Sequence, residues 1–105
     1  MADFTVRIEL HDASGEHYEK LHGAMEKAGY RRYISGTFKG RPGIWQLPTA
    51  EYDFTSSTMS AYDVRDHAKA IADRVKPGAW CLATQVADRA ISSKLLRYTD
   101  QQRRA

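Results

Sequence analysis

The sequence predicts an α+β fold with elements in the order strand, helix, strand, strand, helix, strand. Three observations predict it. Apolar residues alternate strictly over residues 4–10, residues 18–28 and 61–75 repeat apolar positions every three or four residues, and glycine and proline separate the other apolar stretches. A chain of 105 residues is near the commonest size of a single domain.

The first strand is predicted from Phe4 to Leu10, because apolar and polar residues alternate there as on a half-buried sheet. Asp12 and Ser14 follow, and either side chain could accept a free N–H of a helix's first turn. The helix then runs to Gly29, a typical C-terminal stop. Its apolar stripe consists of Tyr18, Leu21, Met25 and Ala28.

The middle of the chain predicts two strands joined by a turn. Residues 30–38 form the first, and the segment "KGRPG" at 39–43 is a turn by composition. The next strand opens at Ile44 and continues to Phe54. Pro48 cannot donate a ladder hydrogen bond, so it marks an edge, a bulge or an end.

Ser60 and Asp63 form a capping-box pattern that starts a second helix, predicted over residues 61–75. A last strand is predicted over residues 79–87. This order matches the ferredoxin-like βαββαβ arrangement, a four-stranded antiparallel sheet with two helices on one face. The other sheet face is then left for a partner, a ligand or a second copy. We expect a single domain over 1–92 and a basic C-terminal tail over 93–105.

Composition limits the function classes. No apolar run approaches the roughly 18 residues of a membrane span, the N-terminus does not resemble a signal peptide, and Cys81 is the single cysteine. We therefore expect a cytoplasmic protein without a membrane partner. The net charge of +3 is weak evidence for a polyanionic partner, and a solvated surface is the alternative. The candidate nucleic-acid-binding residues are Arg7, Arg31, Arg32, Lys39 and Arg41, and the tail adds Lys94, Arg97, Arg103 and Arg104.

The stretch "IELHDA" carries the first candidate for chemistry. His11 is a group that can move a proton near neutral pH, and Asp12 is a carboxylate that could hold a divalent ion beside a phosphate. We therefore name both as candidate catalytic residues, with Asp12 as a possible Mg²⁺ ligand. The alternative is structural: Asp12 caps the helix and His11 is an ordinary polar-face residue.

The stretch "LPTAEYDF" carries the second group of candidate residues. Glu51 and Asp53 share one strand face and could form cross-strand ion pairs with Arg7 or Arg32, or supply acid or base groups. The ion pairs are the favoured interpretation. Trp45 and Trp80 are interpreted as core or dimer-contact residues, and Cys81 as a buried, inert thiol. The sequence carries no glycine-rich phosphate loop, no nucleophile elbow and no RNA-recognition signature.

The segments "TVRIELHDA", "YEKLHGAMEKAGYRR" and "WQLPTAEYDF", within residues 3–87, resemble the GhoS-type endoribonuclease antitoxins of type V toxin–antitoxin systems. These in turn resemble the CRISPR-associated nucleases of the spacer-acquisition complex, which are ferredoxin-like and dimeric. The resemblance implies cleavage of a toxin messenger RNA and places Asp12 at the metal-binding position of the wider group. This chain has His11 where those nucleases have a tyrosine. Cleavage by His11 with arginines, without metal, is therefore the alternative, with Arg7, Arg31 and Arg32 as candidates.

Three hypotheses follow from the sequence. The first is a small dimeric endoribonuclease of the toxin–antitoxin type, acting on RNA. The second is a non-catalytic dimeric interaction protein of the same fold. The third is a protein that binds nucleic acid through its basic edge without cutting it. Fold alone does not choose among them.

Overall fold

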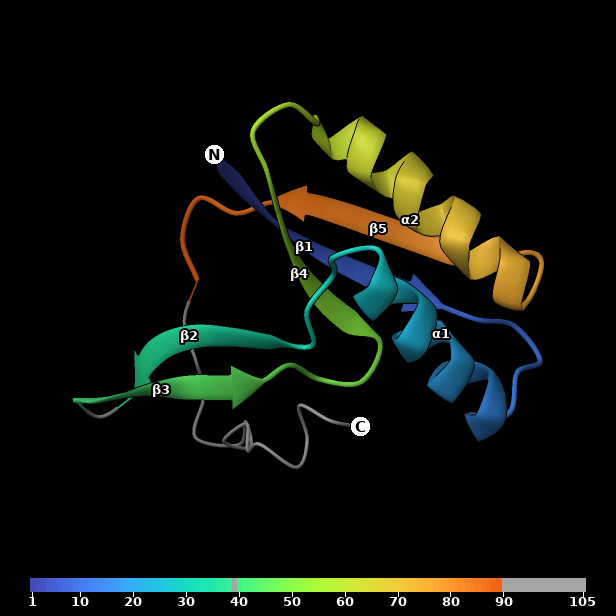
Figure 1. The fold of residues 1–105 in the computed structure, drawn as a ribbon, viewed down its shortest axis with the longest axis horizontal. Coiled ribbons are helices and arrows are strands. Elements are labelled where there is room, and N and C mark those ends of the chain that lie inside the picture. Colours follow the sequence, from blue (N-terminus) through green and yellow to red (C-terminus); the bar gives the residue numbers. More distant parts are fainter. Residues whose placement is uncertain (39, 90–105) are drawn as a thin grey trace.

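The structure, a computed structural model, describes residues 1–38 and 40–89, and this part of the chain contains five strands and two helices (Figure 1). The predicted domain boundary at residue 92, the predicted tail 93–105 and Lys39 lie outside the described residues. In chain order the elements are β1 (Ala2–Glu9), α1 (Gly15–Lys27), β2 (Tyr33–Phe38), β3 (Arg41–Gln46), β4 (Glu51–Ser56), α2 (Ala61–Val75) and β5 (Trp80–Gln85).

The predicted α+β class with antiparallel sheets and two helices is confirmed. The four-stranded sheet is present only in part, because the main sheet has three strands in the order β4-β1-β5, whereas β2 and β3 form a separate two-stranded hairpin. One isolated antiparallel bridge, between Arg31 and Asp53, connects the segment before β2 to the outer side of β4. There the Arg31 N–H donates to the Asp53 carbonyl at 2.8 Å, and the Asp53 N–H donates back at 2.7 Å.

The single strand predicted from Ile44 to Phe54 is wrong, since the chain turns between β3 and β4. Pro48 has no N–H for a ladder, and its carbonyl accepts the N–H of Glu51 at 3.1 Å. Ala50 takes a left-handed conformation with φ of 65°, which no strand residue adopts. Of the three alternatives predicted for Pro48, the end of a strand is the one observed.

Both predicted helices are present, and the structure shows which residue is the N-cap of each. The N-cap of α1 is Ser14, whereas Asp12 lies before it in a left-handed turn with φ of 50°, so the prediction that Asp12 caps the helix is wrong. The box of α2 is confirmed. Its Ser60 Oγ accepts the N–H of Asp63 at 3.2 Å, and the Asp63 carboxylate accepts the N–H of Ser60 at 3.0 Å.

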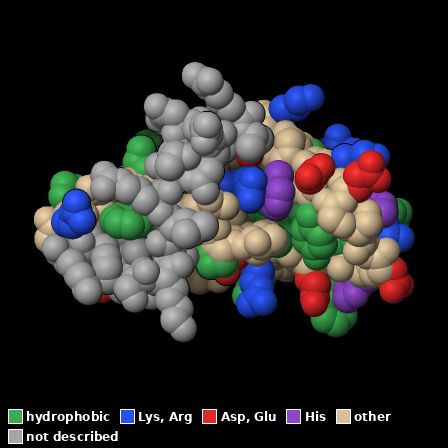
Figure 2. Space-filling model, turned by 90° about the horizontal axis from the view of Figure 1, so that it is seen from below, with side chains coloured by type: hydrophobic (Ala, Val, Ile, Leu, Met, Phe, Trp, Pro, Cys, Tyr) green, Lys and Arg blue, Asp and Glu red, His purple; other side chains and the backbone are tan. Residues whose placement is uncertain are grey.

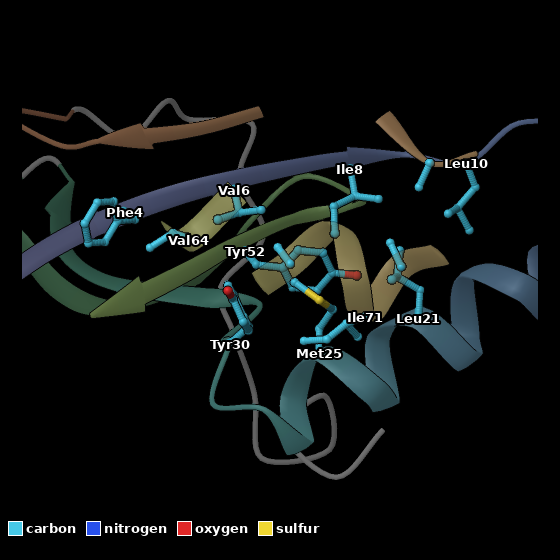
Figure 3. Packing of buried hydrophobic residues seen from close by; sticks show 13 residues of the cluster. Phe4, Val6, Ile8, Leu10, Leu21, Met25, Tyr30, Tyr52, Val64 and Ile71 are labelled. Carbon is cyan, nitrogen blue, oxygen red and sulfur yellow. The ribbon is translucent and has the colours of Figure 1, made fainter. Parts of the chain in front are cut away.

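The hydrophobic core lies between the two helices and one face of the three-stranded sheet (Figure 3). Every second residue of β1 points into it, as the alternation predicted. Leu21 and Met25 of α1 lie near Ile71 of α2, whereas Val64 of α2 lies beside Phe4 and Val6 of β1. None of the helices in the described part of the chain is long and apolar enough to cross a membrane. The fully buried members with the largest side chains are Tyr30, Tyr52, Phe4, Ile8, Leu21, Met25, Val6 and Val64.

The opposite face of the three-stranded sheet, here named the open sheet face, carries the alternate residues of each strand. Neighbours across the strands follow from the register. Arg7 of β1 lies opposite Glu51 of β4 on one side and Leu82 of β5 on the other. The face consists of Asp3, Thr5, Arg7 and Glu9 from β1, Glu51, Asp53 and Thr55 from β4, and Trp80, Leu82 and Thr84 from β5.

Candidate nucleic-acid interface

The end of β1 places the imidazole ring of His11 against the indole ring of Trp80. The two ring centroids are 4.4 Å apart with an interplanar angle of 72°, an edge-to-face contact. The Nε2 atom of His11 is buried and has no hydrogen-bond partner among the described residues. His11 could therefore exchange a proton with a substrate through Nε2 only if Trp80 or the imidazole moved.

Asp12 follows in the exposed left-handed turn between β1 and α1. Over residues 1–38 and 40–89, no group of three or more His, Cys, Asp or Glu side chains lies close enough together to hold a metal ion. A magnesium ion bound through Asp12 would thus take most of its ligands from water and from substrate phosphate, which Mg²⁺ accepts. The assignment of Asp12 as a metal ligand remains a prediction.

The most highly organised group of charges lies at the edge of the open sheet face, where Asp53 of β4 binds two arginines. Arg31 donates from Nε at 3.1 Å and from Nη2 at 2.6 Å to Oδ2 of Asp53. Arg89, which follows β5, donates from Nη1 at 3.2 Å to Oδ1. We name these three residues the Asp53 cluster. Asp53 is 7 % exposed and is the one charged residue in the core of the described chain.

Two hydroxyl groups complete the hydrogen bonding of the Asp53 cluster. Arg31 Nη2 also donates to Thr55 Oγ1 at 2.9 Å, and that hydroxyl donates to Asp3 at 3.0 Å. Arg89 Nη2 donates to Thr5 Oγ1 at 2.9 Å. Both guanidinium groups are therefore held in fixed orientations, because each is bonded to a carboxylate and to a hydroxyl.

A polar hollow of about 210 Å³ opens beside the Asp53 cluster, between the sheet edge and the β2–β3 hairpin. The arginine side chains that face it are partly accessible, at 38 % for Arg31 and 28 % for Arg89. Nη1 of Arg31 and Nε of Arg89 make no hydrogen bond within the described residues. The hollow is lined by Asp3, Arg31, Tyr33, Ile34, Ser35, Asp53 and Arg89.

The structure does not gather the predicted nucleic-acid-binding residues into one patch. Arg31 belongs to the Asp53 cluster, whereas Arg7 lies exposed at the centre of the open sheet face and Arg41 is exposed at the start of the hairpin strand β3. Arg32 lies near His22, on the helix side of the molecule. Lys39 is outside the described residues. The prediction that Glu51 and Asp53 pair with Arg7 or Arg32 is wrong for Asp53, because Arg31 and Arg89 bind it instead. Arg7 does lie opposite Glu51 in the register of β1 and β4.

Two histidine–tyrosine pairs were not expected from the sequence. Nδ1 of His22 lies 2.6 Å from the hydroxyl of Tyr52, and Nδ1 of His67 lies 2.9 Å from the hydroxyl of Tyr30. Burial and, second, the charge of Arg32 lower the pKa of His22 to about 4, so its ring is neutral at pH 7. The helical spacing of His22 gave no signal for this contact, because Tyr52 is thirty residues away.

The charge of the chain is divided unevenly. Residues 1–89 contain twelve basic and twelve acidic residues, whereas residues 90–105 contain four basic residues and one acidic residue. Acidic and basic side chains are interspersed on the face shown in Figure 2. The net charge of +3 therefore resides entirely in the last sixteen residues, and the remainder of the chain offers local arginines but no excess of positive charge.

Comparisons with protein-family models, with curated proteins and with solved structures find no match for this chain.

Proposed function

We propose that this chain is a small RNA-binding protein that holds a backbone phosphate at the Asp53 cluster. The observation that carries the proposal is the pair of guanidinium groups, Arg31 and Arg89, fixed by one nearly buried carboxylate at the rim of a polar hollow. Arginine binds phosphate oxygens through a rigid set of N–H donors, and fixed orientation lowers the entropy lost on binding.

The basic residues at 90–105 supply the long-range attraction for this binding. Phosphate binding by arginine and lysine releases counterions, so affinity falls as salt rises. The Asp53 cluster itself is not strongly positive, since Asp53 offsets one of its two arginines and Asp3, next to the cluster, offsets the other. The C-terminal charges therefore attract the RNA, and Arg31 and Arg89 then orient it.

The resemblance to GhoS-type antitoxins is consistent with this proposal. The bridge between Arg31 and Asp53 lies on the side of β4 where a ferredoxin-like sheet has its remaining strand. We infer a ferredoxin-like sheet whose second strand is reduced to this bridge, because the chain leaves the sheet to form the β2–β3 hairpin. Arg31 then lies where the hairpin and the sheet separate, next to the hollow.

Arg89→Gln tests the proposal, since it removes one guanidinium and leaves Arg31 bonded to Asp53. We expect the affinity for a fluorescently labelled single-stranded RNA to fall about tenfold. This loss corresponds to the free energy that one hydrogen bond to a charged group contributes. The matched control is Arg65→Gln on α2, which makes the same change of charge at an arginine paired with Asp66 at 2.9 Å. It should change affinity less than about twofold. Equal losses in both variants, or no binding by the wild type, would show the cluster is not an RNA site.

A second candidate function is RNA cleavage at the end of β1 by His11, whose Nε2 has no partner in the described part of the chain and would reach RNA once Trp80 or the imidazole moves. A buried polar atom without a partner is rare, and a catalytic role is one explanation for such an atom. We expect His11→Ala to abolish cleavage of a labelled RNA, and Asp12→Ala to do so only where the wild type needs magnesium. Glu16→Ala, an exposed carboxylate in the first turn of α1, is the control. Cleavage that survives His11→Ala would exclude this site.

A further inference from the structure

We propose that β5 pairs antiparallel with β5 of a second copy of this chain, which joins two three-stranded sheets into one continuous sheet. β5 is the outer strand in the order β4-β1-β5, and no described strand pairs with its outer side. An unpaired strand edge presents a row of N–H and C=O groups that another strand can bind. This assembly is independent of RNA binding at the Asp53 cluster.

The sequence of β5 lacks the features that usually protect a free edge. No charged residue occurs from Pro77 to Ala87, and β5 itself contains neither proline nor glycine. Natural edge strands are commonly protected by lysine, proline or a bulge. The opposite edge, β4, differs because it carries Glu51 and Asp53 and is flanked by the bridge to Arg31.

Large apolar side chains are exposed on both sides of this edge. Trp80 and Leu82 are 65 % and 64 % exposed on the open sheet face, and Tyr62 at the start of α2 is 71 % exposed on the helix side. A groove of about 320 Å³ lies between α2 and β5 on that side. Three of the four exposed large apolar residues in the described chain thus border one strand.

A second copy fits this edge better than a charged partner. A strand related to itself by a two-fold axis offers a donor for each acceptor, so the edge complements its own copy. The charges of α2 beside the groove are already paired, Arg65 with Asp66 at 2.9 Å and Lys69 with Asp73 at 2.7 Å. α2 as a whole carries three acidic and three basic residues, so it has no net charge that would repel a second copy or attract a polyanion.

The side-chain sizes favour one register of the paired strands. Residues opposite one another in antiparallel strands share a sheet face, so open-face residues face open-face residues. With Leu82 on the two-fold axis, Leu82 meets its own copy and each Trp80 lies opposite Thr84 of the other chain. That arrangement buries both leucines and forms two aromatic–β-branched pairs, which stabilise sheets.

Sedimentation velocity of the full chain tests the assembly. We expect a particle of twice the 11.9 kDa chain mass for the wild type and a monomer for Leu82→Arg. Thr37→Arg, which adds the same charge at an exposed residue of the β2–β3 hairpin, should remain dimeric. A monomeric wild type, or a folded Leu82→Arg protein that stays dimeric, would overturn the proposal.

Cysteine cross-linking tests the register without a disruptive charge. In a Cys81→Ala background, Leu82→Cys should form an intermolecular disulfide under mild oxidation, because opposite residues bring their Cβ atoms within about 5.5 Å. Thr84→Cys in the same background should not, since Thr84 faces Trp80. Efficient cross-linking at position 84 and none at 82 would overturn the proposed pairing.

Discussion

Asp53→Ala is expected to lower the free energy of unfolding by about 3–5 kcal/mol, the usual cost of removing one partner of a buried ion pair. The loss is large because two guanidinium groups, those of Arg31 and Arg89, depend on this one carboxylate. Each is partly enclosed, so neither regains full hydration when Asp53 is absent. A domain of this size has about 5–15 kcal/mol to lose, and the variant should be close to unfolding.

The control is Asp66→Ala. Asp66 also accepts two hydrogen bonds from one arginine, from Nε of Arg65 at 3.0 Å and from its Nη2 at 2.9 Å. That pair is exposed, with 69 % of the Asp66 side chain accessible, so its removal should cost less than about 1 kcal/mol. Urea denaturation followed by circular dichroism measures both variants. Similar small losses for the two would mean that burial of Asp53 does not matter for stability.

The parts of the fold that the sequence predicted well are those with regular apolar spacing. The core face of β1, the apolar stripes of α1 and α2, and the bounds of α2 all follow from local pattern and capping chemistry. The division of the strand at Pro48 was predicted only as one of three alternatives. The left-handed Ala50 that completes the turn carried no signal, because alanine rarely adopts that conformation.

The candidate site was harder to predict because its contacts join distant segments. Asp53 was recognised as an ion-pair residue, but its partners depend on where Arg31 leaves the sheet and where Arg89 follows β5. The main sheet receives a bridge at Arg31 instead of a full strand, and this bridge brings the Arg31 side chain to Asp53. Strand alternation determines the face on which a residue lies but does not identify the residue it meets there.

The exposed Trp80 is a second case in which strand alternation gives the face of a residue but not what that residue contacts. Strand alternation places Trp80, Leu82 and Thr84 on one face, as the register shows, but no local pattern shows whether that face is covered. Both helices pack on the opposite side of the sheet, which leaves Trp80 to cover His11 and to border the free edge of β5. One tryptophan therefore connects the candidate cleavage site to the proposed dimer, so a dimer contact at Trp80 would also limit movement of His11.

Acid should destabilise the protein through His22 as the pH falls from about 6.5 toward 4. The pKa of this histidine is about 4 in the folded chain, against 6.5 for a free side chain, so the unfolded chain binds the proton first. Neutral His22 makes its full contribution to the free energy of unfolding above pH 6.5, and this contribution is lost as the pH falls from 6.5 toward 4. The difference corresponds to at most about 3 kcal/mol, and screening of the half-exposed ring reduces it to about 2 kcal/mol.

The physical cause lies in the contact with Tyr52. Burial raises the pKa of the Tyr52 hydroxyl, which therefore keeps its proton and can donate it to a neutral Nδ1 of His22 at 2.6 Å. A protonated ring carries a hydrogen on Nδ1 and loses this acceptor, and it also meets the charge of Arg32. His22→Gln keeps a side-chain acceptor but cannot be charged, so it isolates the proton-binding contribution from the titration of carboxylates.

Urea denaturation of the wild type and of His22→Gln at a series of pH values measures this effect. We expect the wild type to lose about 2 kcal/mol more than the variant between pH 7 and pH 4.5. Tyr52→Phe should lower stability at neutral pH, where His22 is neutral, because it removes the hydroxyl that donates to Nδ1 of His22 and leaves this partly buried nitrogen unpaired. Parallel pH profiles for the wild type and His22→Gln would mean that His22 takes up a proton equally well in the folded and unfolded chain. The acid sensitivity would then have to come from carboxylates such as Asp73, whose pKa is lowered by the hydrogen bonds from Lys69 and from the N–H of Ala79.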